Sequence, residues 1–265
     1  MTTLGAIFPP DLPPERLRSV AMAADQAGLQ QLWLWEDCFA ESGIATAGAI
    51  LAWTDRLAVG IGLLPVPLRN VALTAMELAT LQRLFPGRLV PGIGHGVLDW
   101  MGQVGARADS PMTLLREYTV ALRQLLHGAT VTTAGRYVQL DNVALTWPPA
   151  AAPPLLVGAV KPRTVALAGE LADGVILTGD TSPADLRVAV GHLRAGAAAA
   201  DRDVQADVVV FIAVPAAASA DFVAGRVQEF VTAGATHPIL LSVGEGRPLE
   251  RFVEFIAQDV RPLLA

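Results

Sequence analysis

The chain has 265 residues, of which 52% are hydrophobic, and a net charge of −6, so it lacks the basic excess needed to bind a nucleic-acid backbone. Its longest strongly apolar run, 208–218, is too short to cross a bilayer, and no basic segment followed by an apolar one opens the chain. With Cys38 as the only cysteine, an internal disulfide is excluded, and we expect a soluble cytoplasmic protein.

The first half of the chain predicts four strands, each followed by a helix. Residues 4–8 form a short apolar strand, and residues 13–28 place Leu17, Val20 and Ala24 on one helical face. The pattern recurs as strand 30–35 with helix 43–53, strand 57–64 with helix 71–85, and strand 88–95 with helix 111–126.

The second half predicts four more units of the same kind. They are strand 155–158 with helix 163–172, strand 174–177 with helix 183–200, strand 207–214 with helix 220–233, and strand 238–242 with helix 249–263. Residues 208–212 are continuously apolar, which is typical of a parallel strand that is covered on both faces.

Eight alternating units predict an α/β protein of the (β/α)8, or TIM-barrel, class, and a doubly wound open sheet is the alternative. We expect a single domain, 1–265, with insertions near 96–110 and 128–154. The second insertion predicts a hairpin, in which 130–133 and 137–140 flank Gly135.

Two acidic residues follow the second predicted strand. In a barrel of this class the chemistry lies where strands end, so Glu36 and Asp37 are candidate catalytic residues. At least one carboxylate should point into a partly desolvated mouth and have a raised pKa, as proton transfer requires. The alternative is that both are solvated or cap the next turn.

A histidine follows the fourth predicted strand. His95 lies in a run with glycine at 92, 94 and 96, which lets a planar ring approach the backbone, and it is the third catalytic candidate. A hydrogen bond from His95 to a neighbouring loop is the alternative.

Two further positions predict anion binding. The run Gly158, Ala159, Val160, Lys161 stands between strand five and a helix, whose first N–H groups can hold a phosphate beside the Lys161 ammonium. Small residues are also ordinary in such turns. Arg69 can pair with a phosphate or carboxylate, or serve a structural role.

Several common site motifs are absent from the sequence. The four histidines are scattered without metal-ligand spacing, so we expect no metal. Neither a nucleophile elbow nor a P-loop occurs, and Gly60-Ile61-Gly62 is followed by Pro65 where a dinucleotide fingerprint needs its third glycine.

Four stretches together resemble the luciferase-like monooxygenase superfamily over most of the chain. They are Leu32-Trp33-Leu34-Trp35-Glu36-Asp37, Gly60-Ile61-Gly62-Leu63 leading to Pro67-Leu68-Arg69-Asn70, Phe85-Pro86-Gly87-Arg88-Leu89 leading to Gly92-Ile93-Gly94-His95-Gly96, and Leu167-Ala168-Gly169-Glu170-Leu171-Ala172-Asp173-Gly174. The likeness is to the branch that uses the deazaflavin coenzyme F420, which includes methylenetetrahydromethanopterin reductase-like members.

The resemblance implies a bacterial luciferase-like barrel with a cofactor at its mouth. It implies a bulge on the third strand with a non-proline cis peptide at Gly62–Leu63, and a cofactor phosphate at 158–161. Family members often end strand two with Asp-His, but this chain has Glu36-Asp37, so His95 or Glu36 would have to substitute as proton donor.

The sequence therefore predicts an oxidoreductase that transfers a hydride between F420 and an unidentified small organic substrate. The alternatives are an FMN-dependent monooxygenase and a non-catalytic F420- or flavin-binding protein. A homodimer is compatible with apolar outer helices. The residues expected to contact the cofactor are Gly62, Leu63, Leu64, Arg69, Gly94, Gly158, Ala159, Val160, Lys161 and Thr178.

Overall fold

Parallel strands close into a barrel in the computed structural model, which describes residues 2–203 and 205–264. Around the barrel the strands run in the order β1, β10, β9, β8, β7, β4, β3, β2, and β1 pairs in parallel with both β10 and β2. They are β1 (Gly5–Phe8), β2 (Gln31–Leu34), β3 (Ala58–Pro65), β4 (Leu89–Gly94), β7 (Leu156–Gly158), β8 (Gly174–Leu177), β9 (Asp207–Pro215) and β10 (His237–Val243). The predicted (β/α)8 class is confirmed, and the open-sheet alternative is wrong.

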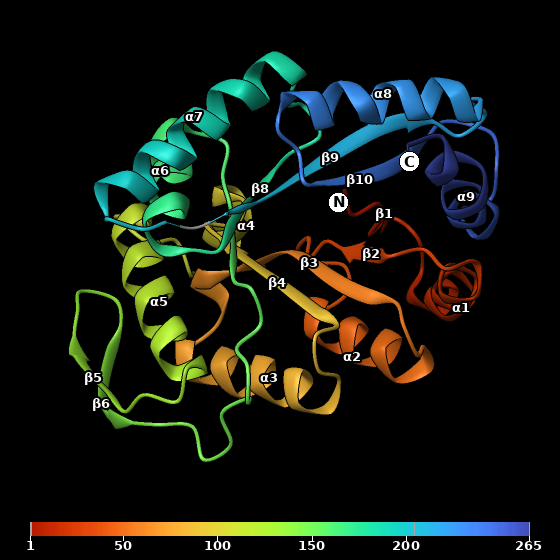
Figure 1. Ribbon diagram of the computed structural model, residues 1–265. Coiled ribbons are helices and arrows are strands. Elements are labelled where there is room, and N and C mark those ends of the chain that lie inside the picture. The colour runs from red at the N-terminus through yellow and green to blue at the C-terminus, as the bar shows by residue number, and fades with distance from the viewer. Residues whose placement is uncertain (1, 204, 265) are drawn as a thin grey trace.

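Helices cover the outside of this barrel, as Figure 1 shows. They are α1 (Leu17–Ala27), α2 (Gly43–Trp53), α3 (Val71–Leu84), α5 (Pro111–Leu126), α6 (Pro162–Leu171), α7 (Pro183–Ala199), α8 (Ala220–Ala233) and α9 (Leu249–Phe255). The predicted helix 13–28 begins instead with a 3-10 turn, Pro14–Arg16, and the predicted helix 249–263 changes after α9 into a π turn and a 3-10 turn. Within the described ranges, no helix combines the length and apolar character that a membrane span needs.

Both predicted insertions contain regular structure. The short helix α4 (Leu98–Gln103) follows β4, and a hairpin of β5 (Val131–Ala134) and β6 (Gln139–Val143) follows α5, beside which it lies in Figure 1. The Glu117 carboxylate on α5 holds this hairpin, because it accepts hydrogen bonds from the backbone N–H groups of 136, 137 and 138 at 2.8–3.0 Å. The sequence predicted the hairpin but not α4.

The apolar core has two layers. On β9, Val208, Val210 and Ile212 point outward into the layer between strands and helices. Val209 and Phe211 point inward and pack with Trp33 of β2 inside the barrel. Both faces of β9 are therefore covered over residues 208–212, which explains why this part of its sequence does not alternate between apolar and polar residues.

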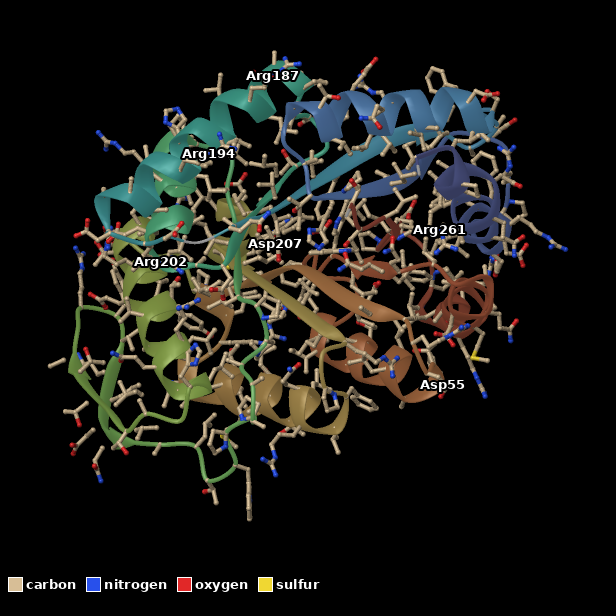
Figure 2. The ribbon with its side chains drawn as sticks, in the orientation of Figure 1. Asp55, Arg187, Arg194, Arg202, Asp207 and Arg261 are labelled. Carbon is tan, nitrogen blue, oxygen red and sulfur yellow. The ribbon has the colours of Figure 1, made fainter. Side chains whose placement is uncertain are left out.

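Charged groups collect at the rim where the strands begin. The Asp173 carboxylate accepts a hydrogen bond from Arg123 at 2.7 Å and lies 3.7 Å from the guanidinium of Arg202. His237 Nδ1 lies 3.8 Å from the carboxylate of Asp207. Arg202 and Asp207 are labelled in Figure 2. Because barrels of this class use the opposite rim for chemistry, we interpret this one as stabilising.

Candidate active site

A cavity of about 630 Å³ opens where the barrel strands end, a size typical of small-molecule sites. The predicted site residues that line it are Glu36, Asp37, Gly62, Leu63, His95, Gly158, Ala159, Val160, Lys161 and Thr178. They come from the ends of β2, β3, β4, β7 and β8, so the parallel barrel brings together residues that lie far apart in the sequence. We call this space the mouth cavity.

The two adjacent carboxylates at the end of β2 have different surroundings. Both oxygens of Glu36 are engaged: the Arg69 guanidinium donates to both, and the N–H of Gly43, the first residue of α2, donates to Oε2 at 2.7 Å. Glu36 therefore binds the first N–H group of α2, which matches the alternative in which this carboxylate caps the next turn.

Asp37 is the carboxylate that is desolvated at the mouth cavity. Its half-buried side chain lines the mouth cavity, and burial raises its pKa above the ordinary value. The prediction that at least one of the two carboxylates would be desolvated with a raised pKa is confirmed for Asp37.

His95 and Trp35 offer unused polar atoms at the mouth cavity. Within the described part of the chain, the buried His95 Nδ1 and Trp35 Nε1 have no hydrogen-bond partner. Burial lowers the pKa of His95, which favours the neutral imidazole. Such buried orphan atoms call for a ligand with acceptor or donor groups, so the site fits a polar heterocyclic cofactor.

The inner wall of the cavity is formed by an irregular part of β3. The register between β3 and β4 shifts between Ile61 and Leu64, and the Gly62–Leu63 peptide bond is cis. Both features implied by the family resemblance are confirmed. The Leu63 side chain turns into the barrel and lies so close to Gly94 and Gly158 that a Cβ atom on these glycines would come within 2.5 and 2.1 Å of its Cδ2.

The glycines of β4 therefore serve a purpose other than the one expected. A Cβ atom on Gly92 would meet the Ile176 side chain at 2.2 Å, and Gly94 lies under Leu63. These glycines admit protein side chains to the barrel interior, and neither of them lines the mouth cavity. Of the three glycines expected to let a cofactor ring approach the backbone, Gly96 lines the mouth cavity, whereas Gly92 and Gly94 do not.

Two more of the expected cofactor contacts lie away from the mouth cavity. Leu64 is 1% exposed and packs in the layer between barrel and helices. The Arg69 guanidinium binds Glu36 and lies 3.5 Å from the Glu77 carboxylate, so these two carboxylates neutralise its positive charge. The structural alternative for Arg69 is the one that the geometry favours.

The turn that leads into α6 lines the mouth cavity with residues 158–161. Lys161 is the N-cap residue and makes no side-chain cap hydrogen bond, and Pro162 opens the helix. The helix dipole and the Lys161 ammonium both favour an anion at this position.

Sequence reasoning missed a group of apolar residues that also line the mouth cavity. They are Val97, Leu98, Trp100, Met112, Ile176 and Phe211. The first three belong to the segment with α4, whose path the sequence does not reveal. Phe211 could have been predicted from the sequence, because a strand residue that points into the barrel near the carboxyl end of the strand must reach the mouth.

Comparison with known proteins agrees with this architecture. A family model described as luciferase-like monooxygenase matches residues 3–258. The solved coenzyme F420-dependent tetrahydromethanopterin reductase from Methanopyrus kandleri superposes with a TM-score of 0.86 and 20% identity, covering 100% of this chain and 99% of that one.

Curated relatives share more of the sequence. The 5,10-methylenetetrahydromethanopterin reductase of Methanolobus tindarius is 29% identical over 242 residues, which is 90% of this chain and 74% of the relative. The F420-dependent hydroxymycolic acid dehydrogenase of Mycobacterium tuberculosis is 32% identical over 206 residues, or 71% of this chain. The chain spans 55% of that second relative's length.

Proposed function

The chain belongs to the luciferase-like monooxygenase family, and on this basis we propose that it is an oxidoreductase that binds coenzyme F420 in its mouth cavity. The reaction is hydride transfer between the deazaflavin and a small organic substrate. The proposal is supported by the mouth cavity itself, whose lining combines apolar side chains with Lys161 at the start of α6. The F420-dependent hydroxymycolic acid dehydrogenase among the relatives supports the choice of cofactor.

The chain's own residues divide into three roles. The turn from Gly158 to Lys161 holds the cofactor phosphate through the Lys161 ammonium, which stands at the positive end of the α6 dipole. Gly62 and Leu63 support the ring, and Thr178 lies at the rim of β8. When bound, the deazaflavin supplies the hydride chemistry, while the protein supplies position and electrostatics.

Proton handling is assigned to two of the three catalytic candidates. Asp37 keeps or releases a proton at its carboxyl group, because burial raises its pKa. Neutral His95 donates or accepts a hydrogen bond at the reacting centre. Glu36 acts indirectly, since its hydrogen bonds hold the end of β2 against the starts of α2 and α3. Arg69, Leu64 and Gly94 are assigned no direct contact with the cofactor.

Equilibrium titration of the cofactor-free protein with F420 and with FMN tests the cofactor assignment. We expect F420 to bind at micromolar concentration and FMN to bind at least tenfold more weakly. Lys161→Ala should weaken F420 binding by roughly tenfold, because a charge-assisted contact to phosphate is lost. Arg194→Ala, which removes an exposed cation from α7 (Figure 2), is the control and should have no effect.

Three outcomes would overturn parts of the proposal. Tighter binding of FMN would replace F420 with the flavin of the monooxygenase alternative. If neither cofactor binds at micromolar concentration, both enzyme assignments fail. If F420 binds but an Asp37→Asn, His95→Ala double variant shows the same F420 turnover as the wild type, the proton-handling roles fail.

A further inference from the structure

The outer part of the mouth cavity is lined by exposed apolar side chains. Val97 and Leu98, at the start of α4, are 46% and 44% exposed, and Val160 is 76% exposed. Trp100 and Met112 line the same cavity. When a ligand covers such apolar surface, the surface is removed from water, and the free energy of binding becomes more favourable by about 25 cal/mol per Å². This part of the cavity therefore favours an apolar ligand.

The charges at the mouth cavity leave no place for an anionic substrate. Among the lining residues that the structure describes, Lys161 is the sole lysine or arginine, and it stands at the start of α6 where the cofactor phosphate is assigned. The Arg69 guanidinium is bound to Glu36. The titratable groups that remain are Asp37 and His95, and burial favours the neutral form of each. A substrate carboxylate or phosphate would therefore lie beside Asp37 without a countercharge.

We propose that the substrate is an uncharged molecule with an apolar skeleton, which packs against Val97, Leu98 and Trp100 and presents one carbonyl or hydroxyl group to Asp37 and His95. The inference rests on the proposed function, because it takes the cofactor phosphate to occupy the α6 start. It excludes sugar phosphates and simple carboxylic acids as the preferred substrates, and it makes α4 the element that determines specificity.

A matched series of probes tests this substrate class. Calorimetric titration would compare 2-octanone, octanoate, octylamine and glucose 6-phosphate, with the cofactor-free protein and with the protein saturated with F420. We expect 2-octanone to bind at least tenfold more tightly than each charged probe. Equal or tighter binding of octanoate, octylamine or glucose 6-phosphate would overturn the inference.

Variants of α4 test which residues set the preference. Leu98→Arg places a cation in the outer cavity, so binding of 2-octanone should fall and binding of octanoate should rise, each by about tenfold. Gln103→Arg adds the same charge to the exposed last residue of α4, outside the cavity lining, and should leave both affinities unchanged. Val97→Lys provides a second variant if Leu98→Arg does not fold by circular dichroism. Unchanged probe affinities in both folded lining variants would contradict the role of α4.

The design separates this inference from the proposed function. If the cofactor-free protein prefers 2-octanone but does not bind F420, the cofactor assignment is rejected and the substrate class is retained. If F420 binds and a charged probe is preferred, the substrate class is rejected and the cofactor assignment is retained.

Discussion

The neighbouring carboxylates Glu36 and Asp37 show how a distant partner decides the role of a residue. Glu36 is bound by Arg69, which lies 33 positions later in the chain, whereas the Asp37 carboxyl group is desolvated at the mouth cavity. The end of an apolar strand predicted that at least one carboxylate would be buried at the mouth. It could not predict which one, because the position of Arg69 depends on how α3 packs against the barrel.

Removing the Arg69 guanidinium should destabilise the protein strongly. Glu36 and Arg69 side chains are only 8% and 15% exposed, so Arg69→Met leaves a buried carboxyl group without its partner and should lower the unfolding free energy by about 3 kcal/mol. The double variant Glu36→Gln, Arg69→Met should recover part of this loss. Urea denaturation measures both effects.

The exposed pair of Arg116 and Glu170 is the control for this measurement. Their side chains are 48% and 33% exposed, and Arg116→Met should cost less than about 1 kcal/mol. If Arg69→Met and Arg116→Met lowered the unfolding free energy equally, burial of the Glu36–Arg69 pair would not add to its stabilising effect.

His95 should make stability depend on pH on the acidic side of neutrality. Burial lowers its pKa in the folded protein, so the unfolded chain takes up the proton first as the pH falls. The contribution of neutral His95 is complete above the unfolded pKa of about 6.5 and is lost as the pH falls through the folded value. The unfolding free energy of the wild type should thus fall more between pH 7 and pH 5 than that of His95→Gln. Parallel decreases in the two proteins would rule out this account of His95.

At the scale of elements, the sequence predicts helices best where a clear start signal precedes an apolar pattern. The bounds of α2, α5 and α8 agree with the prediction to the residue: Ser42 and Ser219 accept capping hydrogen bonds, and α5 begins at Pro111. The C-terminal helix was predicted as one regular helix, but a π turn follows α9 at Ile256–Val260. The short helix α4 was missed because its path depends on packing at the mouth rather than on local periodicity.

Close packing between α6 and α7 is another feature that periodicity does not reveal. A Cβ atom on Gly196 of α7 would lie 2.0 Å from the Ala166 carbonyl oxygen of α6, and one on Gly169 would lie 1.9 Å from the Leu193 carbonyl oxygen. Because the atoms that would clash belong to the backbone, the helices themselves would have to move apart.

Two glycine variants of α7 provide a matched test of this packing. Gly196→Ala should destabilise the protein by roughly 1–3 kcal/mol, as overpacking of a core does. Gly191→Ala, on the same helix with open space around its Cβ position, should stabilise it by up to about 1 kcal/mol through helix propensity. Thermal denaturation would show opposite shifts in Tm, and shifts of the same sign would contradict the packing argument.

At the scale of the whole molecule, strand polarity explains how far the sequence predicted the site. In a closed barrel of parallel strands all carboxyl ends meet at one rim, so most residues expected at that rim do line the mouth cavity. The prediction failed for Gly94 and Leu64, because alternate residues of a strand face the barrel interior or the helices rather than the mouth. The apolar lining from α4 followed from tertiary packing alone.

A crystal structure of the protein soaked with F420 would show whether the cofactor binds in the mouth cavity. We expect the deazaflavin ring to lie against Gly62 and Leu63, with the phosphate beside the Lys161 ammonium at the start of α6. Density for the cofactor at another surface, or a phosphate far from Gly158–Lys161 with the mouth cavity filled by protein side chains, would contradict it.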